Sequence, residues 1–220
     1  MASALLAGGF LLGLAGGCGS QPVARPVVAK PVTVPAQVHE FAEAKDLFYR
    51  SVAGDHDALP AAQKKLEDLG GGSSSDPQVV AYTGAAKLLQ AARAPFWEKP
   101  QLGREGLDLE DRAVAMAPKD LEVRFLRGVT AYQLPEFLGR RATATSDLAY
   151  VASVAEQAAR DGRLDPRAAA ADLVYDGKVR EEKYDAAGAI ADWRAAVRIS
   201  PDSPGGKDAL KHLAEHNVSP

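Results

Sequence analysis

From His39 onward, apolar residues recur at intervals of three and four, the spacing that lines one face of an α-helix. Phe41, Ala44, Phe48 and Val52 follow this spacing in the first such segment. Alanine is abundant and runs of β-branched residues are scarce, which favours helices over strands. The pattern predicts an all-α domain over residues 39–220.

Proline and glycine mark where these helices begin and end. Pro60 predicts the first turn of a second helix over residues 61–69, which turns Leu66 and Leu69 inward. The Gly- and Ser-rich segment 70–75 predicts a loop, and Asp76-Pro77 after it predicts a capped helix start. A last helix is predicted over residues 207–216.

The N-terminal segment has a different pattern. An apolar stretch over residues 2–14, shorter than the roughly 20 residues of a membrane span, ends on small residues directly before Cys18. It resembles the lipobox of bacterial lipoproteins, which implies cleavage before Cys18, a lipid on that cysteine and a membrane anchor. Gly19, standing where an aspartate would, implies the outer membrane facing the periplasm if the cell is Gram-negative. The alternative is a plain secretory signal with an incidental cysteine.

A proline-rich linker follows Cys18. Pro22, Pro26, Pro31 and Pro35 favour an extended tether, about 3.1 Å per residue and about 60 Å in all. The sequence therefore predicts three parts, a signal peptide over residues 1–17, a lipidated cysteine and linker over 18–38, and a helical domain over 39–220.

Three glycines, Gly84, Gly128 and Gly177, interrupt helical patterns. Each costs about 1 kcal/mol relative to alanine in a helix, so each predicts a close contact between helices. The predicted helix starts, seven residues upstream of each glycine, are Pro77, Leu121 and Ala170. The packing positions and closing prolines of the second helices are Gly106, Ala113 and Pro118, and then Ala189, Trp193, Ala196 and Pro201.

These positions resemble the tetratricopeptide repeat, in which helical hairpins stack into a short solenoid. The glycines here stand 44 and 49 residues apart, whereas that repeat has a period of about 34. The resemblance implies that the first helices line a groove for a protein or peptide partner. The implied groove positions are Gln78, Ala81, Ala85, Leu88, Glu122, Phe125, Val129, Tyr132, Ala171, Val174, Lys178 and Glu181. An ordinary helical bundle is the alternative.

The composition excludes several classes of binding site and catalytic chemistry. The net charge is −3 with mixed signs, which gives no footprint for nucleic acid, and a sole cysteine cannot form an internal disulfide. No phosphate loop, nucleophile elbow or Cys/His cluster occurs. His212 and His216 are too few for a zinc site, which leaves a solvated helix face as the simpler interpretation. We expect no metal, no cofactor, no catalytic residue and no enzymatic activity.

One helical segment is rich in carboxylates, and two turn segments are rich in aromatic residues. The carboxylates Glu105, Asp108, Glu110 and Asp111 alternate with arginines and predict a solvated helix exterior. Segments 95–97 and 135–141 contain Phe96, Trp97, Phe137, Arg140 and Arg141, residue types typical of interface hot spots. We expect these turns instead to fold back and bury their aromatic rings against a neighbouring hairpin.

Taken together, the residues favour a membrane-anchored scaffold of the cell envelope that binds a protein or peptide partner as an adaptor or assembly factor. The alternatives are a small-ligand-binding accessory subunit of a transport system and a secreted helical-bundle protein with another role. An enclosed, mostly apolar cavity would favour the small-ligand alternative.

Overall fold

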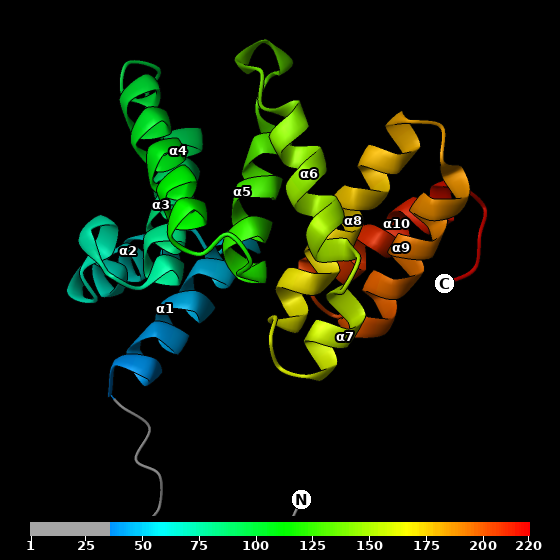
Figure 1. Ribbon diagram of the computed structural model, residues 1–220, viewed down its shortest axis with the longest axis horizontal. Coiled ribbons are helices and arrows are strands. Elements are labelled where there is room, and N and C mark those ends of the chain that lie inside the picture. The colour runs from blue at the N-terminus through cyan, green and yellow to red at the C-terminus, as the bar shows by residue number, and fades with distance from the viewer. Residues whose placement is uncertain (1–35) are drawn as a thin grey trace, which may run out of the picture. The chain divides into compact units, whose positions relative to one another are not determined.

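The computed structural model describes residues 36–220, which form ten α-helices, two short 3₁₀ helices and no strand (Figure 1). The helices are α1 Ala36–Val52, α2 Ala58–Asp68, η1 Gly71–Ser73, α3 Pro77–Arg93, α4 Lys99–Met116, α5 Leu121–Gln133, η2 Glu136–Leu138, α6 Arg141–Ala152, α7 Ala155–Arg160, α8 Pro166–Glu182, α9 Ala186–Ile199 and α10 Pro204–Glu215. The all-α prediction is confirmed for this part of the chain. The predicted signal peptide and Cys18 lie outside the described residues.

The first helix begins earlier than predicted. It starts at Ala36, so residues 36–38 are helical and do not belong to the linker. Val38 suggested an extended chain there, but one exposed β-branched residue costs a helix only a few tenths of a kcal/mol. None of the described helices is both long and apolar enough to cross a membrane.

Aspartate side chains cap several helix starts. Asp76 accepts a hydrogen bond from the backbone N–H of Gln78, so α3 begins at the predicted Pro77, and Asp120 caps α5 in the same way. α8 begins at Pro166 and not at the predicted Ala170. The physical reason is that Asp165-Pro166 repeats the Asp-Pro start signal four residues upstream, and the side chain of Asp165 caps the helix.

Two further helix boundaries differ slightly from the predictions. α2 begins at Ala58, three residues before the predicted start, with Pro60 still in its first turn. α10 begins at Pro204 because Ser203 caps it by accepting a hydrogen bond from the backbone N–H of Gly206.

Consecutive helices pair as hairpins, α3 with α4, α5 with α6 and α8 with α9 (Figure 1). In the last pair, a Cβ added to Gly177 would lie 2.9 Å from Trp193 Cδ1, so the glycine leaves room for the indole. In α3–α4, Gly84 and Gly106 face each other, and a Cβ on Gly84 would lie 2.8 Å from the carbonyl oxygen of Gly106. Small residues therefore set the closest approach within these hairpins.

The other predicted packing residues divide into buried and exposed positions. Ala113, Ala189, Ala196 and Trp193 are fully buried. Pro118 and Pro201 are exposed and follow the ends of α4 and α9 by two residues. These prolines stop their helices and do not pack.

The second helix of the middle hairpin is interrupted. α6 ends at Ala152 and α7 begins at Ala155, so two short helices stand where each of the other hairpins has one continuous second helix. Arg141, the first residue of α6, lies directly after the short turn that follows α5.

An aromatic core joins α1 to α3. Phe41, Phe48 and Tyr49 of α1 surround the fully buried ring of Tyr82 at centroid distances of 5.3–6.3 Å. Val52, predicted on the same face, is about half exposed, and its neighbour Ser51 is buried instead. The helix ends at Val52, so its last turn no longer follows the buried face.

Candidate functional site

The structure does not present the implied groove as an accessible strip. Glu122, Phe125 and Val174 are at most 5% exposed, and Ala81 and Ala85 are also buried. Glu122 is covered because Lys45 of α1 and Tyr82 of α3 contact it, and Val174 is covered because α8 packs against α5, α6 and α9. Of the α5 positions, Glu122 and Phe125 are buried, whereas Val129 and Tyr132 are half-buried.

Glu122 belongs to a buried polar network. Tyr82 donates a hydrogen bond of 2.5 Å to Glu122 Oε1, and Lys45 Nζ of α1 lies 2.5 Å from the same oxygen. Burial raises the pKa of Tyr82 well above its ordinary value. This network ties α1, α3 and α5 together and leaves Glu122 no access to a partner.

The polar members of the implied groove join successive helical units instead. Their contacts run from Gln78 to Asp120, from Tyr132 to Glu182, from Lys178 to Asp208 and from Glu181 to His216, at 2.7–2.9 Å. Leu88 lies against Gly106, and Val129 and Ala171 pack at the edge of the core. The polar positions implied by the repeat resemblance thus lie between successive units, and their hydrogen bonds join these units.

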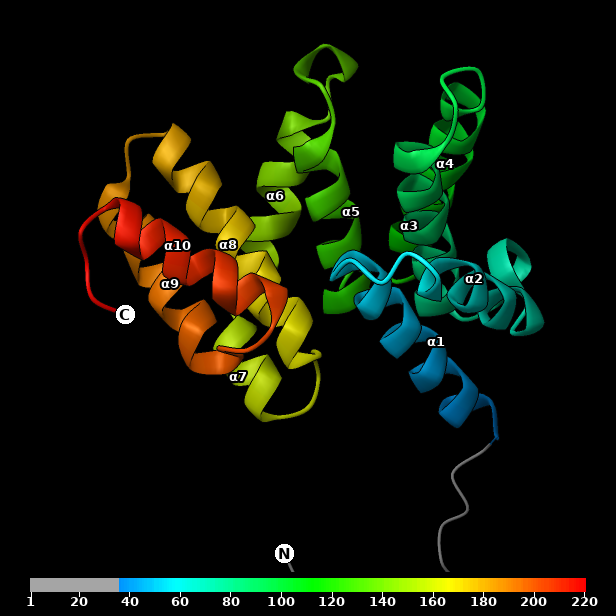
Figure 2. The ribbon, with the colours of Figure 1, turned by 180° about the vertical axis from the view of Figure 1, so that it is seen from behind.

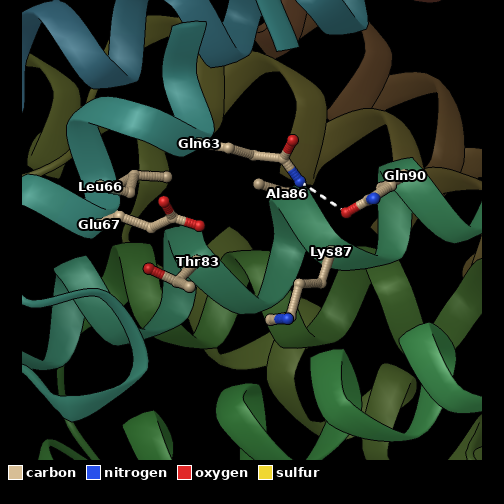
Figure 3. Close-up of a pocket in the computed structure, with 7 residues that line it drawn as sticks. All are labelled: Gln63, Leu66, Glu67, Thr83, Ala86, Lys87 and Gln90. Carbon is tan, nitrogen blue, oxygen red and sulfur yellow. Dashed lines mark hydrogen bonds between the residues drawn. The ribbon is translucent and has the colours of Figure 1, made fainter. Parts of the chain in front are cut away.

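A different hollow lies between α2 and α3 (Figure 3). It has a volume of about 170 Å³ and is lined by Gln63, Leu66, Glu67, Thr83, Ala86, Lys87 and Gln90. Gln63 Nε2 donates a hydrogen bond of 2.8 Å to Gln90 Oε1 across it, the dashed line in Figure 3. Leu66 and Ala86 give the hollow an apolar part and the other side chains a polar one.

The hollow continues past the glutamine pair. A second, more open depression of about 510 Å³ shares Gln63 and Gln90 and is also lined by His56, Leu59, Pro60, Arg93, Ala94 and Glu98. We call the two together the α2–α3 groove. Its charged groups are partly engaged, since Lys87 pairs with Glu105 at 2.8 Å and Arg93 donates to the carbonyl oxygen of Ser51 at 2.9 Å.

No sequence motif indicates this groove. Gln63 and Gln90 lie 27 residues apart on different helices, and glutamine is common on any helix surface. Only the packing of α2 on α3 brings the two amides together.

A second feature is a row of exposed apolar side chains at the hairpin turns, which we call the tip row. It consists of Phe96, Trp97, Phe137, Leu138 and Tyr184. The prediction that the first two turns fold back is wrong, because Phe96 is 78% and Phe137 is 86% exposed. Pro95 and Pro135 follow the ends of α3 and α5, where an extended residue before each proline directs the chain away from its helix.

Carboxyl groups are buried more often than the sequence indicated. Glu110, predicted on a solvated exterior, is fully buried, and its Oε2 has no hydrogen-bond partner. Glu110 lies on α4, which packs against both α3 and α5. Thr130 of α5 donates a hydrogen bond of 2.9 Å to the other carboxylate oxygen, Oε1. Burial raises the pKa of Glu110 well above the ordinary value.

A second buried carboxyl group lies in α8. Asp172 is fully buried and neither of its oxygens has a partner. Burial, with Asp176, Asp192 and Asp147 nearby, raises its pKa well above the ordinary value. Arg180 Nε lies 2.8 Å from oxygens of both Asp176 and Asp192, yet burial still raises the pKa of Asp192 to about 7.

His212 and His216 cover the tryptophan of the last hairpin. The His212 ring stacks on Trp193 at 4.8 Å, and the His216 ring lies at 5.2 Å. They are therefore packing residues more than a solvated face. Within residues 36–220, no group of three or more His, Cys, Asp or Glu side chains is arranged to hold a metal ion.

Searches of protein-family models, curated proteins and solved structures found no match to this chain.

Proposed function

We propose that this chain is a lipid-anchored, tetratricopeptide-like scaffold of the cell envelope that binds an extended peptide segment of a protein partner in the α2–α3 groove. The observation that carries the proposal is the pair of facing amides, Gln63 and Gln90, in an open groove with polar and apolar walls. The scaffold would act as an adaptor or assembly factor, without chemistry of its own.

The hairpins support the repeat part of the proposal. Three consecutive pairs place a glycine of the first helix against the second, and in the last pair that partner is Trp193, flanked along α9 by the buried Ala189 and Ala196. Stacked helical hairpins of this kind form extended surfaces suited to protein partners. The long intervals and the interrupted α6–α7 segment make this array irregular.

The hydrogen-bonding groups of the groove support a peptide as its ligand. Each glutamine amide has two N–H donors and a carbonyl acceptor, and the single bond between Gln63 and Gln90 leaves groups of both kinds free. A peptide backbone presents the same two kinds of group along its length. Glu67, Lys87 and Arg93 line the groove and could select charged side chains of the peptide.

The openness of the groove favours a peptide over a small ligand. Ligand pockets are typically clefts or cavities of about 300–1,000 Å³ that bury most of the ligand's surface. The first hollow is smaller, at about 170 Å³, and the second is an open depression. An extended segment can lie across both without being enclosed.

Cross-linking in membranes tests the groove. A photoreactive residue placed at Glu67, which is exposed and lines the groove, should cross-link a partner, whereas one at the exposed Lys211 of α10 should not. The product is identified by mass spectrometry, and binding is then measured with the purified partner. Gln63→Ala with Gln90→Ala should lower the affinity about tenfold.

A matched control separates recognition from loss of glutamine in general. Gln101→Ala with Gln157→Ala removes two helix-surface glutamines outside the groove and should leave the affinity unchanged. Equal losses in the two double variants, or a product formed equally well from Lys211, would refute the groove.

The anchor is tested separately. We expect incorporation of labelled fatty acid into the chain, its abolition by Cys18→Ser, and accumulation of uncleaved precursor with globomycin. Export of an unlabelled but cleaved chain would instead support the plain secretory signal.

A further inference from the structure

The three hairpin turns lie at one edge of the helical domain. The α3–α4, α5–α6 and α8–α9 turns are all at the upper edge in Figure 1, and Figure 2 shows the same edge from behind. Each turn carries part of the tip row. Tyr184 is 97% exposed and Trp97 67% exposed, so this edge presents large apolar side chains to whatever adjoins it.

The tip side chains have little support from the fold. Phe96 and Trp97 meet edge to face at 5.2 Å, which leaves most of both rings in solvent. Tyr184 has φ 63°, a left-handed conformation that glycine adopts without strain and that costs a tyrosine about 1 kcal/mol. Stability alone would favour glycine there, so an external contact better explains the tyrosine.

Residue types at the edge match the boundary of a bilayer. Tryptophan, tyrosine and phenylalanine favour the interface between headgroups and acyl chains, where an apolar ring can be buried beside water. A basic residue lies close to each tip, namely Lys99, Arg140 with Arg141, and Lys183. Carboxylates lie beside them at Glu98, Glu136, Glu182 and Asp185, so these tip residues carry little net charge.

Shape also favours a membrane over a protein. The tip row is carried by three separate turns along this edge (Figure 1). A rigid partner would need a separate pocket for each turn, whereas a fluid bilayer accommodates all of them. We infer that the tip row inserts into the headgroup region of a phospholipid bilayer and sets the orientation of the domain on the membrane.

The predicted tether exceeds the length of one helix. Residues 19–35 would extend to about 50 Å as polyproline II, whereas α4, with 18 residues, is about 27 Å long. α1 begins at the edge opposite the hairpin turns (Figure 1), so the tether would have to run alongside the helical domain for the lipid to reach the membrane at the tip row. The inference rests on the proposed function only in that the lipid on Cys18 brings the chain to a membrane. It does not depend on the α2–α3 groove.

Cys18 allows a test that reproduces the anchor. It is the only cysteine, so a chain of residues 18–220, which retains every described helix, can be coupled through it to a maleimide lipid in phosphatidylcholine vesicles. The vesicles contain brominated acyl chains, which quench tryptophans that reach them. Trp193 is fully buried in the protein, so quenching and a blue shift of emission report Trp97.

Variants at another turn show whether the tips act together. Phe137→Ser with Leu138→Ser leaves Trp97 in place, yet it should reduce quenching at least about twofold, because the two turns would share one membrane surface. Met116→Ser with Val154→Ser removes one exposed apolar residue at the far end of α4 and one just beyond the far end of α6, and it should have no effect.

The contrary outcomes are equally specific. No quenching in the coupled chain, or equal quenching in the Phe137/Leu138 variant, would overturn the inference. A dimer in light scattering that the tip substitutions abolish, without quenching, would assign the row to a second copy of the chain. Partner binding in the groove is measured separately, so either idea can fail alone.

Discussion

In the α5–α6 hairpin, Gly128 faces the flexible side chain of Leu148, with 3.1 Å to an added Cβ. In the α8–α9 hairpin, Gly177 faces the rigid indole of Trp193. The two hairpins also differ in the pairing of a buried carboxyl group. Asp147 of α6 is paired with two arginines, whereas Asp172 of α8 has no partner.

The turns of these two hairpins complete the contrast. The α5–α6 turn places Gly139 in the left-handed region at φ 69°, and the α8–α9 turn places Tyr184 there at φ 63°. The same hairpin architecture therefore has, in one case, a buried carboxylate held by two arginines and a glycine in the turn, and in the other a rigid indole contact, a buried carboxyl group without a partner and a strained tyrosine in the turn. The two hairpins should respond differently to the same kinds of substitution.

Asp147→Ala should have the largest effect. Arg124 Nη1 and Arg127 Nε lie 2.6 and 2.7 Å from its carboxylate oxygens, and the side chain is 1% exposed. Removing it leaves two half-buried guanidinium groups without this partner, at a cost of about 3–5 kcal/mol in the free energy of unfolding. Urea denaturation measures this, with Asp172→Asn as the control that should cost little. Equal losses of stability in Asp147→Ala and Asp172→Asn would show that the pairing of the buried carboxyl group does not distinguish the two hairpins.

Gly177→Ala comes next. The added methyl group meets the buried indole of Trp193, so we expect a net loss of about 1–3 kcal/mol from overpacking. Gly128→Ala should be close to neutral, because Leu148 can shift and alanine gains about 1 kcal/mol in helix propensity. Thermal unfolding of both variants compares the two contacts directly. A greater loss in Gly128→Ala would mean that the indole is the more mobile neighbour.

The protonated carboxyl groups predict a pH dependence. The folded-state pKa values of Asp172, Asp192 and Glu110 are raised, so the folded chain holds protons that the unfolded chain releases above about pH 4. Stability is fully present below that value and is lost as the pH rises toward the folded pKa, which is about 7 for Asp192.

We expect a lower melting temperature at pH 8 than at pH 5, which corresponds to a free energy of unfolding lower by roughly 2 kcal/mol. Asp192→Asn should flatten the profile, because an amide does not ionise. Asp147→Asn tests the other hairpin and should not flatten it. A melting temperature that rises from pH 5 to pH 8 would contradict the assignment.

Tyr184→Gly should have the smallest effect and the opposite sign. Glycine relieves the left-handed strain, so the free energy of unfolding should rise by about 0.5–1 kcal/mol. The reciprocal change, Gly139→Tyr, should destabilise by about 1 kcal/mol. Chemical denaturation with replicate midpoints can resolve both. A destabilised Tyr184→Gly variant would show that the tyrosine supports the fold.

Much of the helical framework was predictable from local signals. Asp76-Pro77 marked a helix start, and the spacing of Gly177 and Trp193 anticipated their contact. Those signals are local because N-caps and mid-helix glycines act within a few residues or across one hairpin. The start of α8 was predicted wrongly because the seven-residue offset from Gly177 indicates Ala170, whereas the helix begins at the Asp-Pro pair Asp165-Pro166.

The accessible surfaces were not predictable in the same way. Glu122 was assigned to a groove, but it is covered through contacts with Lys45, far away in the sequence. The exposure of Phe96 and Phe137 depends on the direction in which each turn leaves its helix, which residue type does not determine. Gln63 and Gln90 carry no motif at all, and only tertiary packing makes them a pair.

The bond between Gln63 and Gln90 has a consequence for selectivity. A segment that uses these amides exchanges one hydrogen bond for others, so the net gain in affinity is small, about 0.5–1.5 kcal/mol for each additional bond. A segment that breaks this bond without replacing it would leave the donor and the acceptor without partners and away from water, at a cost of about 1–3 kcal/mol. The closed glutamine pair would therefore act less as a source of binding strength than as a filter against unsuitable sequences.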